Sequence, residues 1–376
     1  MKRSVLAPRF VRGCALLSAV VIAPVFATAA VVETDDGPVE ITEMVGGLTE
    51  PWGIAFLPDG SQLITERDGR LLHATVDGPT VEVTGVPEVW AEGQGGLLDV
   101  MVPADFAETR EVFLTYSKPQ DGGEAGTALA SARLSDNGTA LEGLADLFVM
   151  TPGGSRGQHF GSRVVEGPDA HLFVTIGERG NRDLAQDLTV HNGTTIRLNR
   201  DGSVPEDNPF VGQEGAQPEI WSYGHRNAQG ADIDAEGRFW VVEHGAQGGD
   251  EVNLVEPGVN FGWPVISYGQ NYNGTPIGEG QTKEGMAQPA HYWDPSIAPS
   301  GMAFHSGTAF PDWEGHALVG SLKFNYIAVL DPSDWSEVQI ESDETLRVRD
   351  VAEAPDGSVW FLSVGNGAAY RMTPTE

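Results

Sequence analysis

The chain of 376 residues contains one cysteine, Cys14, which lies in a segment unlike the rest. Residues 1–29 start with basic residues, continue as a short uncharged apolar run and end in Ala27-Thr28-Ala29. This pattern is typical of a secretory signal peptide, because an A-x-A sequence follows a run too short to span a bilayer. We therefore expect a periplasmic or secreted protein formed by residues 30–376; the alternative, an uncleaved membrane anchor, is disfavoured by the same length.

Once residues 1–29 are removed, the chain has no thiol at all. This absence excludes disulfide bonds, cysteine nucleophiles and cysteine-ligated metals. A chain of this length buries enough apolar area to fold without covalent cross-links. The sequence shows no linker that would separate a second domain, so residues 30–376 are expected to form a single domain.

Positive charge is also scarce, with 22 Lys and Arg against 54 Asp and Glu, and only four lysines in the whole chain. Four basic residues and no acids lie in residues 1–29, which leaves 18 basic against 54 acidic residues and a net charge of −36. Such a surface argues against nucleic acid and anionic membranes as partners. It suits a saline habitat, where salt screens self-repulsion, and equally a soluble acidic exported protein.

Long apolar stripes with helical period are scarce, whereas 48 glycines and 24 prolines punctuate the chain. Short alternating apolar runs follow tight turns instead, a pattern that predicts strands. The clearest runs are LPDGSQLITE (57–66), EGPDAHLFVTIGE (166–178), DAEGRFWVVEHG (234–245) and APDGSVWFLSVG (354–365).

The distances between these turns fit one or two units of about 55–65 residues, which is typical of the blades of a β-propeller. The length then predicts an all-β, six-bladed β-propeller; a β-sandwich or a β-helix does not explain so long a unit. We expect the last strand, residues 368–372, to pair with an N-terminal strand within residues 34–50, because this pairing removes an exposed edge.

His159 is the first candidate for catalysis. It stands in GSRGQHFGSRV (154–164), and Glu178 follows the next predicted strand. A turn at residues 167–170 can return Glu178 to His159, where a carboxylate would fix the imidazole tautomer and raise its basicity. A general base is one interpretation of His159, and a buried structural histidine is the other.

Two further polar motifs lie between predicted strands. Gln94 stands in GQGGLLDV (93–100), where the glycines allow close approach of backbone and ligand or simply form a bulge. Arg226 and Asn227 stand in IWSYGHRNAQG (220–230). The arginine is either a surface group or a planar clamp on an anion or carbonyl oxygen.

A glycine-rich stretch and a set of three cations each suggest a ligand site. In VVEHGAQGGDEVN (241–253) the exposed carbonyls and nearby acids suit Ca²⁺, whereas no second histidine lies at zinc-ligand spacing. Lys323, Arg347 and Arg349 can gather into an anion site, with the two arginines on one face of a strand. The alternative is that each cation pairs with a surface acid.

Together these motifs resemble the glucose/sorbosone dehydrogenase family, to which soluble periplasmic aldose sugar dehydrogenases dependent on pyrroloquinoline quinone (PQQ) belong. The resemblance extends from about Leu48 to Met372. It is carried by the order and completeness of LTEPWGIAFLPDG, GQGGLLDV, GQHFGSRVV, IGERGNRDLAQDL, IWSYGHRNAQG, EHGAQGGDEVN, NFGWP, PSIAPSGMAF and RVRDVAEAPDG. It implies a six-bladed propeller that oxidises the C1 hydroxyl of aldoses to lactones.

The resemblance also implies roles for individual residues. His159 is the base that takes the proton of the sugar C1 hydroxyl while hydride moves to the C5 carbon of PQQ, and Glu178 orients it. Arg226 contacts the quinone oxygen on which negative charge develops. The residues that match PQQ contacts of the family are Gln94, His159, Arg226, Asn227, Lys323, Arg347 and Arg349.

The carbonyls of Gly245 and Ala246 match those that bind the active-site Ca²⁺, a Lewis acid for the quinone. Ala246 replaces the proline usual in the family, and Gln158 and Glu178 replace aspartates of the glucose-oxidising branch. These departures favour the broader aldose branch over strict glucose preference. The chain also lacks recognisable dimer-forming insertions, so a monomer that passes electrons to an unidentified external acceptor is expected.

Two rival functions remain at this stage. A Ca²⁺-dependent lactonase on a similar propeller requires carboxylate and asparagine ligands that converge on the metal, and has no use for three gathered cations. A non-catalytic binding propeller has no reason to combine His159, Arg226 and the cations. The cation cluster therefore favours the PQQ enzyme.

Overall fold

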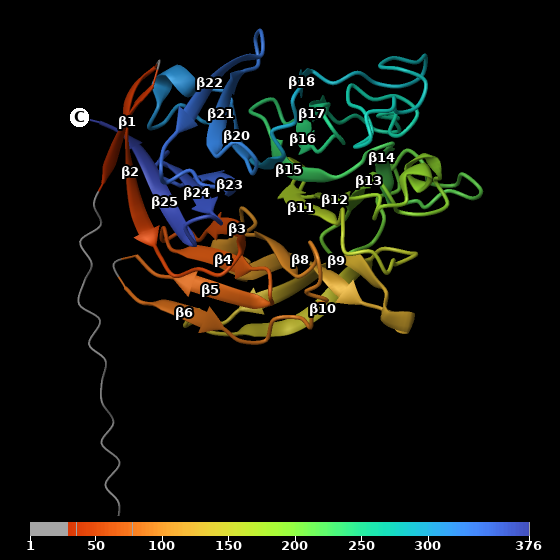
Figure 1. Cartoon of the computed structure of the whole chain (residues 1–376). Helices are drawn as coiled ribbons and strands as arrows, with labels where there is room; N and C mark the ends of the chain where they lie inside the picture. Colours follow the sequence, from red (N-terminus) through yellow and green to blue (C-terminus); the bar gives the residue numbers. More distant parts are fainter. Residues whose placement is uncertain (1–28, 35, 77, 376) are drawn as a thin grey trace, which may run out of the picture.

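The computed structural model describes residues 29–34, 36–76 and 78–375, so the predicted signal peptide lies outside the described residues except for Ala29. Six antiparallel sheets surround a common centre, which confirms the prediction of an all-β, six-bladed β-propeller (Figure 1). In the part of the chain that the structure describes, no helix is both long enough and apolar enough to cross a membrane.

Blades 1–5 are four-stranded meanders, whereas blade 6 joins three C-terminal strands to two strands from the N-terminus. The first strands of neighbouring blades contact one another around the centre. Blade 1 consists of β3 (Pro51–Phe56), β4 (Gln62–Glu66), β5 (Arg70–Ala74) and β6 (Thr80–Val83); blade 2 of β7 (Leu97–Met101), β8 (Glu111–Pro119), β9 (Ala125–Leu134) and β10 (Leu141–Val149); blade 3 of β11 (Gly161–Glu166), β12 (Leu172–Ile176), β13 (Thr194–Leu198) and β14 (Ile220–Tyr223). Blade 4 consists of β15 (Ala228–Ile233), β16 (Phe239–Glu243), β17 (Asp250–Leu254) and β18 (His291–Trp293); blade 5 of β19 (Pro299–Phe304), β20 (Ala317–Ser321), β21 (Tyr326–Asp331) and β22 (Ser336–Glu341); blade 6 of β23 (Val348–Glu353), β24 (Val359–Ser363), β25 (Ala368–Pro374), β2 (Gly37–Val45) and β1 (Ala30–Thr34). The helices are single turns: α1 (Phe106–Thr109), η1 (Asp121–Gly123), η2 (Arg182–Gln186) and η3 (Pro311–Trp313).

The two ends of the chain close the ring in blade 6. Strand β2 pairs with β25 in antiparallel register, with Ile41 opposite Met372, as predicted for residues 368–372. Strand β1 then adds a fifth strand outside β2, with Ala30 opposite Ile41. Ile41 and Met372 are fully buried in the core between blades 5 and 6, so the apolar residues of both chain ends stabilise the closure.

Threonines on second strands tie neighbouring blades together around the centre. The hydroxyls of Thr65, Thr115 and Thr175 donate hydrogen bonds to carbonyl oxygens of the innermost strand of the next blade, at Leu98, Ser162 and Ala228. Each hydroxyl also accepts an amide hydrogen from the innermost strand of its own blade, at Gly53, Asp99 and Arg163. Every hydroxyl thus fixes the spacing between two innermost strands, and these strands carry the residues at the centre of the ring.

A buried ionic group fills the centre. Arg163 of β11 donates to Asp99 of β7 at 2.8 Å and lies 3.0 Å from a carboxylate oxygen of Asp350 of β23. The ring of Trp52 from β3 lies 4.6 Å from the guanidinium of Arg163 and 4.5 Å from that of Arg349. Four blades therefore meet through this group, and two of its members, Trp52 and Arg349, also line the cavity described next.

Candidate active site

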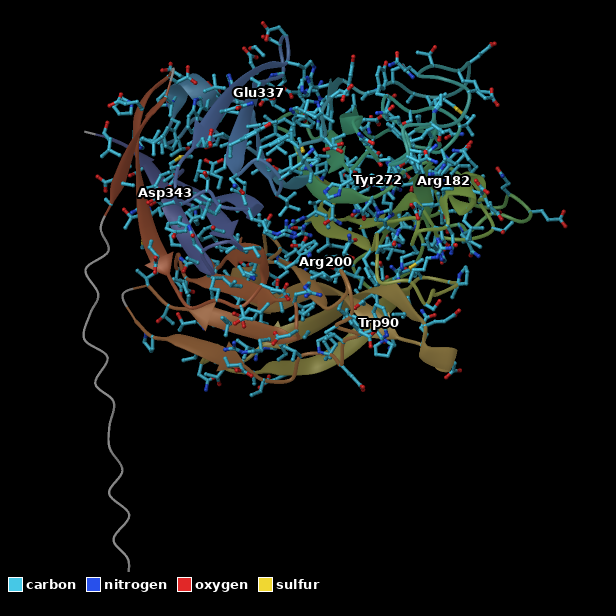
Figure 2. The ribbon with its side chains drawn as sticks, in the orientation of Figure 1. Trp90, Arg182, Arg200, Tyr272, Glu337 and Asp343 are labelled. Atoms are coloured by element: carbon cyan, nitrogen blue, oxygen red, sulfur yellow. The ribbon has the colours of Figure 1, made fainter. Side chains whose placement is uncertain are left out.

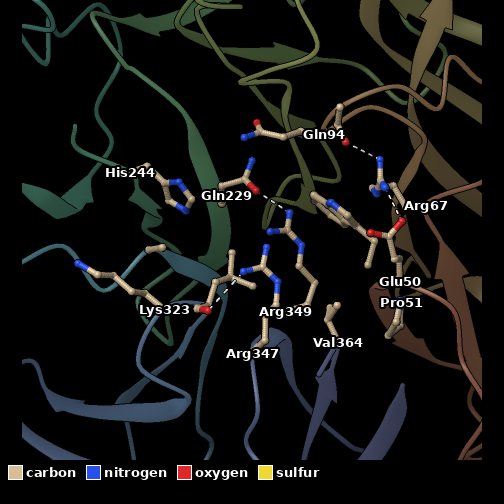
Figure 3. Close-up of a pocket in the computed structure, with 14 residues that line it drawn as sticks. Glu50, Pro51, Arg67, Gln94, Gln229, His244, Lys323, Arg347, Arg349 and Val364 are labelled. Atoms are coloured by element: carbon tan, nitrogen blue, oxygen red, sulfur yellow. Dashed lines mark hydrogen bonds and ion pairs between the residues drawn. The ribbon is translucent and has the colours of Figure 1, made fainter. Parts of the chain in front are cut away.

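A cavity of about 550 Å³ adjoins the buried ionic group at Trp52 and Arg349 (Figure 3). Its walls come from blades 1, 2, 4, 5 and 6, so residues far apart in sequence converge there. The polar and aromatic side chains that line it are Glu50, Trp52, Arg67, Gln94, Gln229, His244, Lys323, Arg347 and Arg349. Four of these nine side chains are cationic and one is anionic.

Lys323, Arg347 and Arg349 all line this cavity, so the structure brings the three predicted cations together. The prediction that the two arginines share a strand face is wrong, because Arg347 precedes β23 and has a left-handed backbone with φ 54°. The side chain of Asn325 accepts the Arg347 amide hydrogen at 2.9 Å and holds this turn. The turn, rather than strand alternation, directs both guanidinium groups into one cavity.

Arg349 carries a charge that the protein only partly compensates. Its Nη2 donates to Gln229 at 2.5 Å, whereas its buried Nε has no partner within the described residues. Burial and the positive charges of Arg163 and Arg347 lower the pKa of Arg349 to about 9. An anion in the cavity would relieve this unfavourable electrostatic environment, so the cavity suits a ligand with several negative charges.

Sequence reasoning missed three residues of this cavity. Trp52 lies between two guanidinium groups, Gln229 holds Arg349, and Arg67 forms an ion pair with Glu50 at the rim. Trp52 stands inside the motif LTEPWGIAFLPDG, and this position could have identified it from the sequence. Gln229 likewise stands inside the motif IWSYGHRNAQG, whereas Arg67 carries no such signal, because only the closure of the ring places it at the cavity.

His159 lies beside the cavity, just before β11. Gln94 accepts the His159 backbone amide hydrogen at 2.7 Å, and the Nδ1 atom lies 2.8 Å from a carboxylate oxygen of Glu178. The pairing predicted from the β11–β12 hairpin is therefore present. It requires Gly177, because a Cβ atom there would lie 2.1 Å from the His159 carbonyl oxygen.

The environment of His159 suits a neutral imidazole. Its side chain is mostly buried, and burial lowers the pKa of His159 more than the hydrogen bond with Glu178 raises it. The positive charge of Arg226 lowers that pKa further. We assign the ring proton to Nδ1, facing the carboxylate, which leaves Nε2 as a hydrogen-bond acceptor. A neutral imidazole with this geometry can accept a proton at pH 7.

Arg226 and Asn227 follow β14 and differ in what they contact. Arg226 is buried; its Nη1 donates to the His244 carbonyl at 3.2 Å, and its Nε has no partner within the described chain. Asn227 is buried and its side-chain oxygen accepts the Gly161 amide hydrogen at 3.1 Å. Arg226 therefore retains donor capacity, and Asn227 positions the start of β11 next to His159 through its side-chain oxygen.

The loop after β16 holds the predicted calcium ligands. Asp250 accepts amide hydrogens from Gly245 and from Ala298, both at 2.7 Å, and so anchors the loop with both of its oxygens. No backbone amide of the described chain donates to the carbonyl oxygens of Gly245 or Ala246. Free carbonyl oxygens are ligands that Ca²⁺ accepts, so the donor chemistry of this loop fits the ion.

Two other kinds of metal site were considered, one that uses His244 and one built from a group of His, Asp and Glu side chains, and neither fits the described residues. His244 is already engaged, with Nε2 2.8 Å from the Pro299 carbonyl oxygen, and burial together with Arg226 lowers its pKa to about 3. Across residues 29–34, 36–76 and 78–375, no group of three or more His, Asp and Glu side chains could hold a metal ion.

Comparison with known proteins places the chain among sugar-oxidising enzymes. A family model described as glucose / sorbosone dehydrogenase matches residues 48–371. Aldose sugar dehydrogenase YliI of Escherichia coli (strain K12) is 41% identical over 336 residues, which cover 87% of this chain and 91% of that protein. Quinoprotein glucose dehydrogenase B of Acinetobacter calcoaceticus is 28% identical over 406 residues, with 85% and 84% coverage.

Solved structures agree with the sequence comparison. The crystal structure of the soluble aldose sugar dehydrogenase from Escherichia coli in the apo-form superposes with a TM-score of 0.85 at 38% identity. The match covers 90% of this chain and all of that one. The likeness therefore extends over most of the chain.

Proposed function

Because the chain belongs to the glucose / sorbosone dehydrogenase family, we propose that it is a PQQ-dependent dehydrogenase that oxidises the C1 hydroxyl of aldose sugars to lactones. Relatives named aldose sugar dehydrogenase and quinoprotein glucose dehydrogenase support this activity. The observation that carries the proposal is the partly compensated cation cluster beside a histidine–carboxylate pair. A lactonase or a binding module explains neither feature.

The cavity would hold PQQ by its three carboxylates. Lys323, Arg347 and Arg349 supply the matching positive charges, and the unpartnered Nε of Arg349 is a donor that a carboxylate would satisfy. Gln94 and Arg226 would add polar contacts at the side nearest His159. Asn227 would contribute mainly by fixing that side of the cavity, since its side-chain oxygen is already used.

When bound, PQQ would accept a hydride from the sugar, and Ca²⁺ on the carbonyl oxygens of Gly245 and Ala246 would act on its quinone as a Lewis acid. The protein's own residues would handle the proton. His159 Nε2 would accept the proton of the C1 hydroxyl, and Glu178 would stabilise the imidazolium and hold the ring in place. Arg226 would stabilise the negative charge that develops nearby.

Further aspects belong to the same proposal. Residues 30–376 would act as a single exported domain after removal of residues 1–29, in the periplasm or outside the cell. The protein would work as a monomer and pass two electrons per sugar to an external acceptor. The acidic surface argues against nucleic acid or an anionic membrane as that partner.

The first test is reconstitution of the purified protein with PQQ and Ca²⁺, followed through the quinone absorbance. We expect one PQQ per chain to bind tightly, and the addition of an aldose to bleach the absorbance. Absence of PQQ binding would refute the cofactor assignment and revive the lactonase and binding-module interpretations.

The calcium assignment is tested by the same titration in the presence of a chelator. We expect chelation to weaken PQQ binding and to lower turnover, and added Ca²⁺ to restore both, because the loop supplies free carbonyl oxygens for the ion. The variant Asp250→Asn, which removes a charge but keeps a hydrogen-bonding side chain, would serve to perturb the loop. Unchanged PQQ binding and turnover in the chelator would show that the carbonyl site is misassigned.

The pH profile tests the base. A base acts only when it is unprotonated, and the pKa of His159 is lowered. The apparent pKa of the acid limb of the kcat/KM profile should therefore lie below the ordinary histidine value of about 6.5. In Glu178→Gln the loss of the negative charge should shift this limb to still lower pH and reduce turnover by roughly tenfold or more. A limb that moves to higher pH, or does not move, would contradict the role of Glu178.

A further inference from the structure

A buried group of polar side chains lies beside Arg226 and has no part in the function proposed above. The Nδ1 atom of His225 lies 2.8 Å from a carboxylate oxygen of Glu243, and its Nε2 atom lies 2.8 Å from the hydroxyl oxygen of Ser222. All three side chains are buried, and His225 is 0% exposed. Serine, histidine and carboxylate in this order form a nucleophilic triad at an open site, but burial here keeps a substrate away from the serine. The role of the group must therefore concern the protein around it.

The carboxylate of Glu243, at the end of β16, meets three donors. One of its oxygens lies 2.8 Å from His225 Nδ1 and accepts a hydrogen bond from the side chain of Asn253 at 3.0 Å. The other oxygen accepts the backbone amide hydrogen of Arg226 at 2.7 Å. The carboxylate thereby joins β16 and β17 of blade 4 to the connection that leaves blade 3. Both oxygens are engaged, so the position of the carboxylate is fixed.

His225 is itself held where blades 3 and 4 meet. Its ring stacks on Phe261 with ring centroids 4.5 Å apart, and its backbone amide donates to the Gly193 carbonyl oxygen at 3.0 Å. A Cβ atom on Gly193 would lie 2.4 Å from the His225 carbonyl oxygen, so the two backbones are in contact there. Side chains fill the space between the two blades, of which blade 3 is marked by Arg182 and blade 4 by Tyr272 (Figure 2). This packing keeps the His225 ring against Glu243.

The backbone of Arg226 is held on both sides. Its amide donates to Glu243, and its carbonyl oxygen accepts the amide hydrogen of Glu178 at 3.0 Å. The side chain of Glu178 lies 2.8 Å from His159 Nδ1. In contrast, the guanidinium of Arg226 donates only to the His244 carbonyl within the described chain, and its Nε has no partner there. The direction of this guanidinium is therefore set mainly by its backbone.

We propose that Glu243 is a positioning residue for the oxidation: it fixes the backbone of Arg226 and so directs the guanidinium to the place where negative charge develops beside His159. This inference rests on the proposed sugar oxidation and extends it to a buried residue behind the reacting groups. His225 supports the same role, because it holds the carboxylate of Glu243 through Nδ1. Loss of such a support displaces the group it holds, and a displacement of about 1 Å can lower a rate by about 10²-fold.

The first test is a double-mutant cycle in the holoenzyme, with an artificial electron acceptor. Glu243→Leu removes both acceptor oxygens, and we expect kcat to fall by about ten- to 100-fold, whereas PQQ affinity should stay within about threefold because the three cations of the cavity remain. Because Glu243 acts through Arg226, adding Glu243→Leu to Arg226→Ala should lower kcat by less than about twofold. Glu243→Gln keeps one acceptor oxygen and should lose about three- to tenfold; it carries the same cycle where the leucine variant does not fold.

Asp234, at the other end of the β15–β16 hairpin, provides the matched control. It is 7% exposed, accepts the backbone amide hydrogen of Arg238 at 2.9 Å and the indole hydrogen of Trp240 at 2.7 Å, and does not line the cavity. Asp234→Leu and Asp234→Asn therefore remove the same chemical groups from a similarly buried site. We expect them to lower the melting temperature, as the Glu243 variants do, and to leave kcat of the folded protein within about twofold.

The second test reports the position of Arg226 without turnover. Burial and the positive charge of Arg226 lower the pKa of His159. The charged and titratable groups that face His159 are Glu178, Arg179, Arg226 and His244. An NMR titration of the purified protein, before PQQ is added, should give a higher pKa for His159 in Glu243→Leu than in the unaltered protein, and no change in Asp234→Leu. Loss of the Glu243 charge by itself acts in the opposite direction, so a rise reports displacement of Arg226.

Three results would overturn the proposal: Glu243→Leu retains its kcat, its loss multiplies with that of Arg226→Ala, or the pKa of His159 is the same in Glu243→Leu and in the unaltered protein. A protein that binds no PQQ and oxidises no aldose would refute the proposed function alone. The NMR titration would then still decide whether Glu243 holds Arg226 in place.

Discussion

His159→Ala should lower kcat by about 10²- to 10⁴-fold, which is the contribution of a positioned general base. The side chain offers a neutral Nε2, held by Glu178 at 2.8 Å through Nδ1, and alanine removes this proton acceptor. Cofactor binding should change little, because Gln94 holds the backbone amide of residue 159 and not its imidazole. The measurement is steady-state turnover together with a PQQ titration of the same preparation.

The control for this variant is His73→Gln in blade 1. His73 is also buried, but both of its ring nitrogens lie at hydrogen-bond distance from protein oxygens, of Gly138 and Ser61, and it lies outside the cavity. Its replacement should affect stability and leave kcat within about twofold for the folded protein, as expected for a residue far from the chemistry. If His159→Ala binds PQQ and retains most of its turnover, His159 is not the base.

The double variant Arg347→Ala, Arg349→Ala should weaken PQQ binding by about 10²- to 10⁴-fold, since a charge-assisted hydrogen bond contributes about 1.5–3 kcal/mol. The pKa of Arg349, lowered to about 9, shows that burial disfavours its charge without an anion. The protein without cofactor should therefore tolerate the loss, whereas the stabilisation that added PQQ confers should largely disappear. Calorimetric titration and the melting temperature with and without PQQ measure the two effects.

The control for the double variant is Arg238→Ala, which removes a guanidinium group away from the cavity. Arg238 pairs with Asp234 and Glu236 on the turn before β16 and does not line the cavity. PQQ affinity should remain unchanged in this variant. If the double variant also binds PQQ with unchanged affinity, the cation cluster is a surface feature and not the cofactor site.

The architecture was predictable because a propeller is built from local signals. Each tight turn followed by an alternating strand is encoded within about ten residues, and their spacing sets the blade length. The closure of the ring was also predictable, since an apolar strand at 368–372 needs a partner that removes its exposed edge. The fifth strand β1 was not expected, because residues 30–34 had no recognised pairing signal.

The residues of the site were also predictable only where their contacts are local in sequence. His159 and Glu178 are 19 residues apart on one hairpin, so the sequence already indicated their contact. Lys323 and Arg349 come from different blades, so the sequence could only suggest that they gather into an anion site, and the closed ring was needed to bring them together. Arg67 was missed because nothing near it in sequence differs from an ordinary surface residue, and Gln229 was missed although it stands in the motif IWSYGHRNAQG, because only the closed ring brings it to Arg349.

The sequence alone therefore determined the class of fold and the His159–Glu178 pair. It also determined the large excess of acidic over basic residues, against which a cluster of cations stands out. Only the tertiary structure decided the protonation state on which the chemistry depends. From sequence, Glu178 was expected to make His159 more basic; in the folded protein burial and Arg226 outweigh the carboxylate and lower the pKa of His159. Burial and the distances between charges on different blades exist only once the ring has closed, and these two quantities set the electrostatics of the site.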